Sequence, residues 1–405
     1  MPFFRLYKKP EGSFFLFGPR GVGKSTFIRD QIKPDLTLNL LDSSLFLELK
    51  RNPALLESKI SGLKRSKTAP ITVCIDEIQK IPLLLDEVHR LIEKKWEKRG
   101  GKGEEKGIHF ILTGSSARKL KRSGSNLLGG RAQTRRMFPF SLAELGDALS
   151  PSRCLEVGTL PVIFGQIKNA EEALLSYVDT YLKEEIREEA ITRNLEDFVR
   201  FLEVSAQMNG RVINFERVGS ETGKSGDTIK KWYSILEETF QGMTLPSFRP
   251  GFKVREVSHS KFYYFDPGVA RAAAGLIREP LDALTKGFAL ETLVLNELRI
   301  YNEVSRRERN ISFYGVTGSD EIDFIVETQK KTIDRPGQFV SIECKASERW
   351  NSDYEKHSRS LYERSKKSHK KMLGVYLGKE ELRFGDFHVL PLKIFVEKLH
   401  KKELF

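Results

Sequence analysis

The chain has 405 residues, 39% of them hydrophobic, a net charge of +13 and three widely separated cysteines. Its length calls for two or three domains, and it offers neither paired cysteines nor an apolar run long enough for a membrane span or a signal-peptide core. The excess of positive charge favours a nucleic-acid partner; the alternative is that many lysines lie on solvated helix faces.

The first motif is a glycine-rich loop with the sequence Gly-Pro-Arg-Gly-Val-Gly-Lys-Ser at residues 18–25. Such a loop places backbone N–H groups around phosphates, while Lys24 reaches the β- and γ-phosphates and the hydroxyl of Ser25 ligates Mg²⁺. An apolar run at 14–17 indicates a buried parallel strand before it, and a helix pattern begins at Thr26. The alternative is a plain glycine turn. The residues predicted to bind ATP or GTP are Gly18, Pro19, Arg20, Gly21, Val22, Gly23, Lys24, Ser25 and Thr26.

A second apolar run at 71–75 ends in the acidic pair Asp76 and Glu77. In doubly wound sheets the carboxyl ends of the strands face the ligand. There Asp76 would hold the metal through its shell, and Glu77 would polarise the water that attacks the γ-phosphate. An acidic cap on the next helix is the alternative. The two motifs together predict nucleotide hydrolysis.

Residues 1–150 have the pattern of one α/β unit, and 94–107 are charged and glycine-rich, as in an exposed loop. The apolar run at 108–113 ends in Thr113, and Ser115 and Ser116 follow shortly after it. Thr113 or Ser115 could sense the γ-phosphate; the alternative is a plain transition from strand to turn. The candidate strands are 14–17, 36–41, 71–75, 108–113 and 134–138.

Arg131 follows two glycines in the sequence Leu-Leu-Gly-Gly-Arg at residues 127–131. An arginine at such a hinge can be delivered to the nucleotide of a neighbouring subunit in a homo-oligomer, where its charge stabilises the transition state. The alternative is an arginine that lies on the surface or faces nucleic acid.

Residues 151–275 are mostly helical in pattern. Within them, 213–236 resembles a helix-turn-helix, with Lys230 and Lys231 on the second helix. Such a helix could lie in the major groove of DNA, although similar modules beside ATPase cores often contact only protein. A strand that ends in a turn is expected at 261–265.

Residues 276–405 hold a separate group of charged side chains. The strongly apolar helix pattern at 287–298 contains Glu291, and strand patterns follow at 321–326 and 339–345. Strict alternation in the first strand would turn Glu321 and Asp323 to one face. The residues expected on its opposite face are Ile322, Phe324 and Val326.

The second strand would turn Glu343 and Lys345 to a shared face, so that carboxylates and a lysine converge on one side of a hairpin-like pair. Metal-assisted phosphodiester cleavage requires this convergence. Asp323, Glu343 and the carbonyl of Cys344 would ligate Mg²⁺ or Mn²⁺. Lys345 would orient the nucleophile or offset phosphorane charge, and Glu291 would reach a second metal position. The alternative is a solvent-facing strand with ordinary salt bridges.

The segments GPRGVGKST, ITVCIDEIQK, ILTGSSARKL and LLGGRAQTRRMFPFSLAEL resemble the predicted prokaryotic AAA+ ATPases. In that family a C-terminal domain of poorly defined function follows, matched here by KFYYFDPG, KGFALETLVLNEL, EIDFIV and IECK. The resemblance implies an α/β P-loop AAA+ core with a parallel sheet, a winged-helix-like middle and an α/β restriction-endonuclease-like end of PD-(D/E)XK type.

By this resemblance Asp323, Glu343 and Lys345 match the nuclease triad, and Glu291 matches its helix carboxylate. Lys24 with Ser25, Asp76 with Glu77, and Thr113 match the P-loop, the Walker B pair and the sensor strand. The sequence departs from the pattern at Ile322, where a proline sometimes stands before the first nuclease aspartate. A second-sensor arginine also has no evident counterpart.

We therefore predict a cytoplasmic, ATP-hydrolysing AAA+ protein with an ATPase core at 1–150, a helical winged-helix-like domain at 151–275 and a nuclease-like domain at 276–405. It would bind DNA, without membrane contact, and cleave it with a divalent metal. The alternative is an ATPase switch or scaffold whose C-terminal domain binds DNA or protein without cutting. A nucleotide kinase would need a small-substrate lid, and the sequence has no pattern for one.

Overall fold

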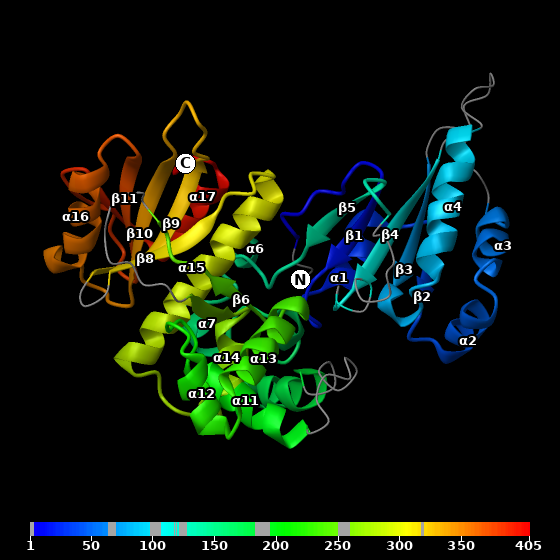
Figure 1. Cartoon of the computed structure of the whole chain (residues 1–405), viewed down its shortest axis with the longest axis horizontal. Helices are drawn as coiled ribbons and strands as arrows, with labels where there is room; N and C mark the ends of the chain where they lie inside the picture. The colour runs from blue at the N-terminus through cyan, green and yellow to red at the C-terminus, as the bar shows by residue number, and fades with distance from the viewer. Residues whose placement is uncertain are drawn as a thin grey trace. The chain divides into compact units, whose positions relative to one another are not determined.

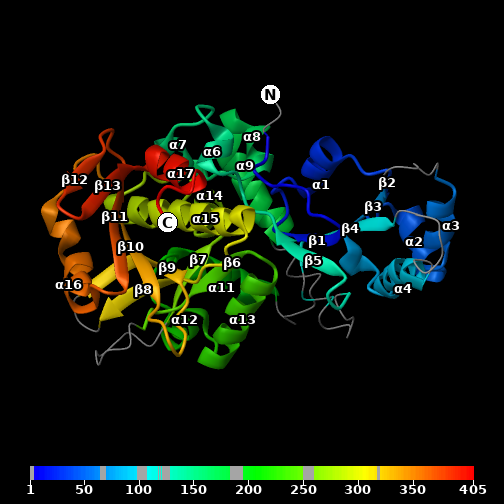
Figure 2. The same cartoon turned by 90° about the horizontal axis from the view of Figure 1, so that it is seen from above.

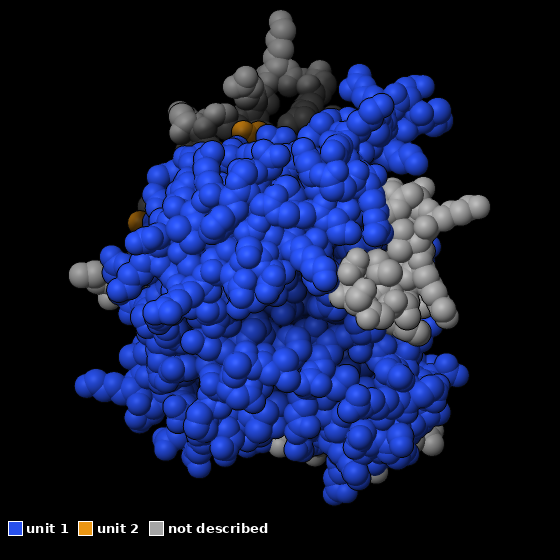
Figure 3. All heavy atoms as spheres, turned by 90° about the vertical axis from the view of Figure 1, so that its left-hand side faces the viewer, with its two compact units in different colours: residues 1–6, 139–237, 241–405 blue, residues 7–138, 238–240 orange. Residues whose placement is uncertain are grey.

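The computed structural model describes residues 4–63, 70–97, 107–116, 118, 120, 128–182, 195–249, 260–316 and 320–405. The chain divides into two compact units. The P-loop unit comprises residues 7–138 with 238–240, and the large unit comprises 1–6, 139–237 and 241–405. Figure 3 colours the large unit blue and the P-loop unit orange.

The P-loop unit is built on a five-stranded sheet in which every pair is parallel, in the order β2-β3-β4-β1-β5 (Figure 1). Its strands are β1 (Ser13–Phe17), β2 (Leu36–Asn39), β3 (Ile71–Asp76), β4 (Ile108–Gly114) and β5 (Ala132–Arg136). Every residue of β1 and β3 is buried, which explains why their sequences are mostly apolar rather than alternating. The predicted α/β unit with five strands is confirmed, with ends shifted by one or two residues.

Helices connect these strands. They are α1 (Lys24–Phe27), continued by a π-helical turn at Ile28–Ile32, α2 (Ser43–Arg51), α3 (Leu55–Ser61), a 3₁₀ turn at Ile78–Lys80, and α4 (Leu84–Glu97). The predicted loop at 94–107 is wrong at its start, because α4 runs through Glu97. Lysine and glutamate are good helix formers, so charge alone did not mark the helix end. Residues 98–106 of that prediction lie outside the described ranges.

The first part of the large unit is helical. Its helices are α6 (Leu142–Leu145), α7 (Pro151–Val157), α8 (Pro161–Phe164), α9 (Ala170–Ser176), α11 (Leu195–Gln207), α12 (Phe215–Thr222), α13 (Gly226–Glu238) and α14 (Pro267–Ala273). Helix α12 ends at Thr222 and is followed by Gly223, whose φ of 68° is left-handed, and α13 begins three residues after that glycine. The two helices predicted at 213–236 are therefore present. The antiparallel hairpin of β6 (Gly242–Leu245) and β7 (Lys261–Tyr264) follows them.

The second part of the large unit is a six-stranded mixed sheet in the order β12-β13-β11-β10-β9-β8. Its strands are β8 (Ile311–Val316), β9 (Asp320–Gln329), β10 (Gln338–Lys345), β11 (His369–Tyr376), β12 (Leu382–Phe384) and β13 (Phe387–Pro391). Strands β9 and β10 pair antiparallel, as the predicted hairpin-like arrangement requires, whereas β10 and β11 are parallel.

Helices cover both faces of this sheet. The long helix α15 (Ala283–Ser305) and α17 (Leu392–His400) share one apolar core with the sheet, and α16 (Lys356–Ser365) contributes Leu361 to a second core. Figure 2 shows α15 and α17 side by side, with α16 across the sheet from them. Among the described residues, no helix combines the length and apolar character needed to cross a bilayer.

Candidate functional sites

The glycine-rich loop joins β1 to α1 in the P-loop unit. Gly21 and Gly23 have φ of 78° and 86°, in the left-handed region that favours glycine. A Cβ at Gly18 would lie 2.3 Å from the carbonyl oxygen of Met137, so a side chain is excluded there too. The buried Lys24 donates from Nζ to the carbonyl oxygens of Gly18 (2.7 Å) and Pro19 (2.9 Å). Its ammonium is therefore held against the loop that precedes it.

Asp76 lies at the end of β3 and connects two of the other predicted residues. Ser25 Oγ donates to its Oδ2 at 2.9 Å, and Thr113 Oγ1 donates to its Oδ1. Thr113 in turn accepts a bond of 3.2 Å from the backbone N–H of Glu77. Strand β4 lies between β1 and β3, which places Thr113 beside both motifs. The structure thus brings the loop, the acidic pair and the hydroxyl of β4 together.

Gln79 was missed by the sequence reasoning. It is buried two residues after Glu77, and its Nε2 donates to Glu77 Oε2 and to Ser115 Oγ (3.3 Å). A Cβ at Gly114 would lie 2.6 Å from Gln79 Oε1, so this glycine makes room for the amide. Glu77 itself has a left-handed φ of 60°. The only available signal was a polar residue close to the acidic pair.

Arg131 is not brought to these residues within the P-loop unit. Its guanidinium pairs with Glu93 on α4 at 2.5 Å and donates to the carbonyl oxygen of Gly129 at 3.4 Å. Leu127 of the predicted hinge lies outside the described ranges, while Gly130 has the left-handed φ of a turn. A role in a neighbouring subunit stays a prediction.

The second candidate site lies in the large unit, where β9, β10 and α15 meet. It contains Asp323, Glu343 and Glu291, all buried, together with the half-buried Lys345. Asp323 Oδ2 accepts a 2.7 Å bond from the backbone N–H of Cys344, and Lys345 Nζ pairs with Glu343 Oε1 at 2.5 Å. Burial and the neighbouring Asp323 carboxylate raise the pKa of Glu343.

The expected strict alternation in β9 is wrong. Phe324 and Val326 pack on the α15 side of the sheet, but Ile322 packs on the other side with Leu361. The pairing with β8 gives the reason. Ser312 pairs with Ile325 and Tyr314 pairs with Ile322, so the one residue between them on β8 lies opposite two residues on β9. Such an extra residue is a β-bulge, which re-aims the side chains around it. The bulge includes Asp323.

Lys261 and Tyr263, on β7, are two further residues that the sequence reasoning missed. Lys261 is only 2% exposed; its Nζ pairs with Glu321 and lies 3.9 Å from Glu291 Oε2. Tyr263 donates from its hydroxyl to the same Glu291 oxygen at 2.6 Å. The side chains of residues two apart on a strand share a face, which was the available signal.

These contacts decide which groups suit a metal ion. One oxygen of Glu343, Oε2, is buried with no hydrogen-bond partner in the described part of the chain. Together with Asp323 it forms an oxygen donor pair of the kind that Mg²⁺ and Mn²⁺ prefer. Glu291 is engaged by Lys261 and Tyr263 instead, and burial with the Asp323 charge raises its pKa to about 8. Among the described residues, no three His, Cys, Asp or Glu side chains form a ready metal-binding group.

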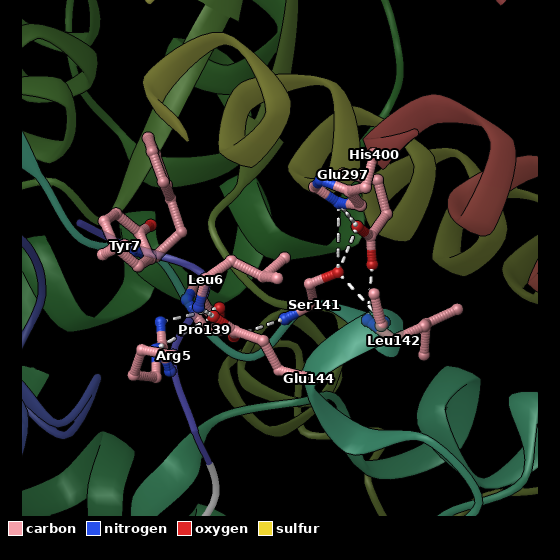
Figure 4. Close-up of polar contacts among 11 residues, drawn as sticks. Arg5, Leu6, Tyr7, Pro139, Ser141, Leu142, Glu144, Glu297 and His400 are labelled. Atoms are coloured by element: carbon pink, nitrogen blue, oxygen red, sulfur yellow. Dashed lines mark hydrogen bonds and ion pairs between the residues drawn. The ribbon is translucent and has the colours of Figure 1, made fainter. Parts of the chain in front are cut away.

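A buried Ser-His-Glu group elsewhere in the large unit does not have the geometry of a nucleophilic triad (Figure 4). Ser141 Oγ donates to Glu297 Oε2 at 2.7 Å, and His400 Nε2 lies 3.2 Å from that same oxygen and 3.3 Å from Ser141 Oγ. The serine thus bonds the acid directly, and a single ring nitrogen of the histidine faces both groups. A triad needs the histidine between the hydroxyl and the acid. Glu297 Oε1 also accepts from the N–H of Leu142, so the group fastens the start of α6 to α15 and α17.

Figure 4 also shows Glu144 holding the first described residues of the chain. Its carboxylate accepts from the N–H groups of Leu6 (2.7 Å) and Ser141 (3.0 Å) and pairs with Arg5 at 3.4 Å. Arg5 also donates to the carbonyl oxygen of Pro139. The segments that precede and follow residues 7–138 are thereby tied to each other.

Comparison with family models divides the chain into three matches. Residues 11–146 match the model described as AAA domain. Residues 152–279 match Domain of unknown function (DUF8612), and residues 286–395 match Domain of unknown function (DUF4143). The amino-terminal match and the P-loop sheet define an AAA-type P-loop ATPase domain. A search of curated proteins found no match.

Among solved structures, the chain is similar to the ORC2 protein of Aeropyrum pernix in two forms. The form with ADPNP and ADP is 13% identical with a TM-score of 0.35, covering 66% of this chain and 87% of that chain. The ADP form is 12% identical with a TM-score of 0.29, covering 70% and 88%. Likeness at this level carries no argument about what this chain does.

Proposed function

We propose that the chain is an AAA+ ATPase whose large unit binds DNA and cleaves it with a divalent metal ion at Asp323, Glu343 and Lys345. The observation that carries the cleavage half is the buried Glu343, whose Oε2 has no described partner, beside Asp323 and Lys345 on adjoining strands. Buried carboxylates whose pKa is raised, as that of Glu343 is, cluster at functional sites. We also propose that the chain has three domains: an ATPase core at 1–150, a winged-helix-like domain at 151–275 and a nuclease-like domain at 276–405.

In the ATPase half, the chain's own groups bind and orient the triphosphate. Backbone N–H groups of the glycine-rich loop, from residues 20–25, would surround the phosphates, and the Lys24 ammonium would move from the carbonyl oxygens of Gly18 and Pro19 to phosphate oxygens. Ser25 and Asp76, which are hydrogen-bonded to each other, would hold a Mg²⁺ ion, and that ion would supply positive charge to offset the phosphates. Glu77 would accept the proton of the attacking water. Thr113, which donates to Asp76 and accepts from the N–H of Glu77, would hold these two residues in position. Arg131 would act on the nucleotide of a second subunit.

Gln79 gives a sharp test of this arrangement. We expect Gln79→Ala to lower kcat for ATP hydrolysis about 10- to 100-fold with little change in nucleotide affinity, because the amide positions Glu77 without belonging to the glycine-rich loop. Phosphate release and fluorescent-nucleotide binding measure the two effects. Gln133→Ala, an exposed glutamine on β5, is the matched control and should leave both unchanged. Equal kcat in Gln79→Ala and wild type would contradict the positioning role.

In the cleavage half, the side chains of β9 and β10 hold the reacting groups. Asp323 and Glu343 supply anionic oxygens, and the carbonyl of Cys344 is the third donor. These oxygens would hold Mg²⁺ or Mn²⁺, which when bound would supply a water of lowered pKa and positive charge for the phosphate under attack. Lys345, beside Glu343 and partly exposed, offers a proton or a positive charge at the open edge of the cluster.

DNA contact is proposed for α13. Lys230 and Lys231 are exposed on this helix, while Ile229 and Trp232 on either side of the pair are buried. We expect the Lys230→Ala, Lys231→Ala double variant to weaken DNA binding several-fold. The slope of log affinity against log salt concentration should also become shallower, by an amount that corresponds to the loss of up to about two phosphate contacts. Fluorescence anisotropy at several salt concentrations measures both effects. If affinity and slope are both unchanged, α13 does not contact DNA, and the alternative that this module contacts protein is favoured.

The alternative is an ATPase switch or scaffold whose large unit grips DNA or protein without cutting. One observation favours it: among the described residues, no three His, Cys, Asp or Glu side chains are placed to bind one metal ion. The deciding experiment incubates the purified full chain with single-stranded, duplex and branched DNA, with Mg²⁺ or Mn²⁺, in the presence and absence of ATP. Metal-dependent cleavage supports the nuclease, whereas binding of DNA without any cleavage supports the scaffold.

A further inference from the structure

Lys261 is an unusual residue for a strand in an apolar core. Its side chain is 2% exposed on β7, and the ammonium lies 5.3 Å from the centre of the Phe313 ring. Taking an ammonium out of water is costly unless opposite charges compensate it. Lys261 has that compensation, since it pairs with Glu321 and lies 3.9 Å from Glu291. A buried lysine held among carboxylates is thus part of the cluster.

The position of this ammonium coincides with a place where the sequence predicted a metal ion. Glu291 was expected to reach a second metal position from its helix. In the structure its Oε2 accepts the hydroxyl of Tyr263 at 2.6 Å and faces the Lys261 ammonium. By contrast, Glu343 Oε2 has no such partner among the described residues. The two ends of the cluster therefore differ in how their negative charge is balanced.

We propose that Lys261 is a built-in cation that takes the place of a second metal ion at Glu291, so that the cluster accepts one divalent ion, at Asp323 and Glu343. The inference rests on the proposed metal site of the large unit. A divalent ion beside Glu291 would face the fixed positive charge of Lys261 at close range, and that repulsion excludes it. The lysine also keeps Glu291 and Glu321 compensated when the metal at Asp323 and Glu343 is absent.

Counting Mn²⁺ ions tests this directly. Full-length wild type and Lys261→Met, which keeps the length of the stem and removes the charge, are titrated with Mn²⁺ without nucleotide. Free Mn²⁺ is measured by electron paramagnetic resonance. We expect Lys261→Met to bind one more Mn²⁺ per chain than wild type, and Lys261→Met with Glu291→Gln to lose that additional ion. Lys345→Met, which removes the other lysine of the cluster, is the matched control and should gain no ion that depends on Glu291.

Two results would overturn the inference: an identical count in Lys261→Met and wild type, or a wild-type ion that Glu291→Gln removes. If circular dichroism shows that Lys261→Met does not fold, the Lys261→Met, Glu321→Gln double variant replaces it, because it removes one charge of each sign. The metal site itself is tested separately, since Asp323→Asn should lower the wild-type count by one. Failure of that result would remove the proposed metal site, and neither count depends on whether DNA is cut.

Discussion

Lys24→Ala protein is expected to hydrolyse ATP at least about 100-fold more slowly than wild type while keeping its fold. The ammonium of Lys24 is buried and bound by the carbonyl oxygens of the glycine-rich loop, so it is already positioned at the phosphate site. Removing a preorganised positive group from the place where transition-state charge develops typically costs two to three orders of magnitude. Phosphate release under saturating ATP measures the loss.

The control for this experiment is Lys50→Ala, which removes an exposed lysine on α2 of the same unit. It should retain wild-type activity. Thermal melting of both variants separates a lost charge from a lost fold, because truncating an exposed lysine changes stability little. Lys24→Ala protein that melts like wild type and hydrolyses ATP within a few-fold of it would contradict the assignment of the loop.

The fold of the P-loop unit could be predicted well because its signals are local. The buried strands β1 and β3 are mostly apolar, and the glycines of residues 18–23 have backbone conformations or close contacts that disfavour a side chain. The apolar runs and the left-handed glycines do not depend on a distant partner, whereas the close contact at Gly18 is with Met137. The contact of Asp76 with Ser25 also followed, since parallel strands end at one edge of the sheet.

The candidate site of the large unit was only partly predictable, because its geometry depends on pairs far apart in the sequence. Lys261 meets Glu321, which lies 60 residues further along the chain, and no local pattern indicates this contact. The bulge in β9 arises from the register with β8 and breaks the period of two on which the prediction of Ile322 was based. The alternation and spacing of the two strand patterns made Asp323 and Glu343 candidate site residues, and the pairing of distant strands decides which side chains surround them.

The same tertiary pairing explains why Asp323→Asn should cost activity without costing stability. Burial and, after it, the Asp323 carboxylate raise the pKa of both Glu343 and Glu291, so the three buried acids repel one another when all are charged. Asparagine has nearly the same size, and its carbonyl oxygen can still accept from the N–H of Cys344. The variant loses one negative charge from a crowded group, so we expect its melting temperature to equal or exceed that of wild type at neutral pH.

Its metal-dependent cleavage of DNA should nevertheless fall about 100-fold or more, because one of two anionic metal ligands is gone, while ATP hydrolysis in the other unit persists. Gel assays with Mg²⁺ and Mn²⁺ measure cleavage, and phosphate release measures the ATPase. Glu327→Gln makes the same chemical change further along β9, where the carboxylate accepts from Asn310, and should leave both activities intact. Cleavage that survives in Asp323→Asn would separate the reaction from this cluster. If Asp323→Asn loses cleavage but is at least as stable as wild type, Asp323 serves the reaction rather than the fold. An aspartate that only stabilised the fold would lower the stability of the protein when it is replaced.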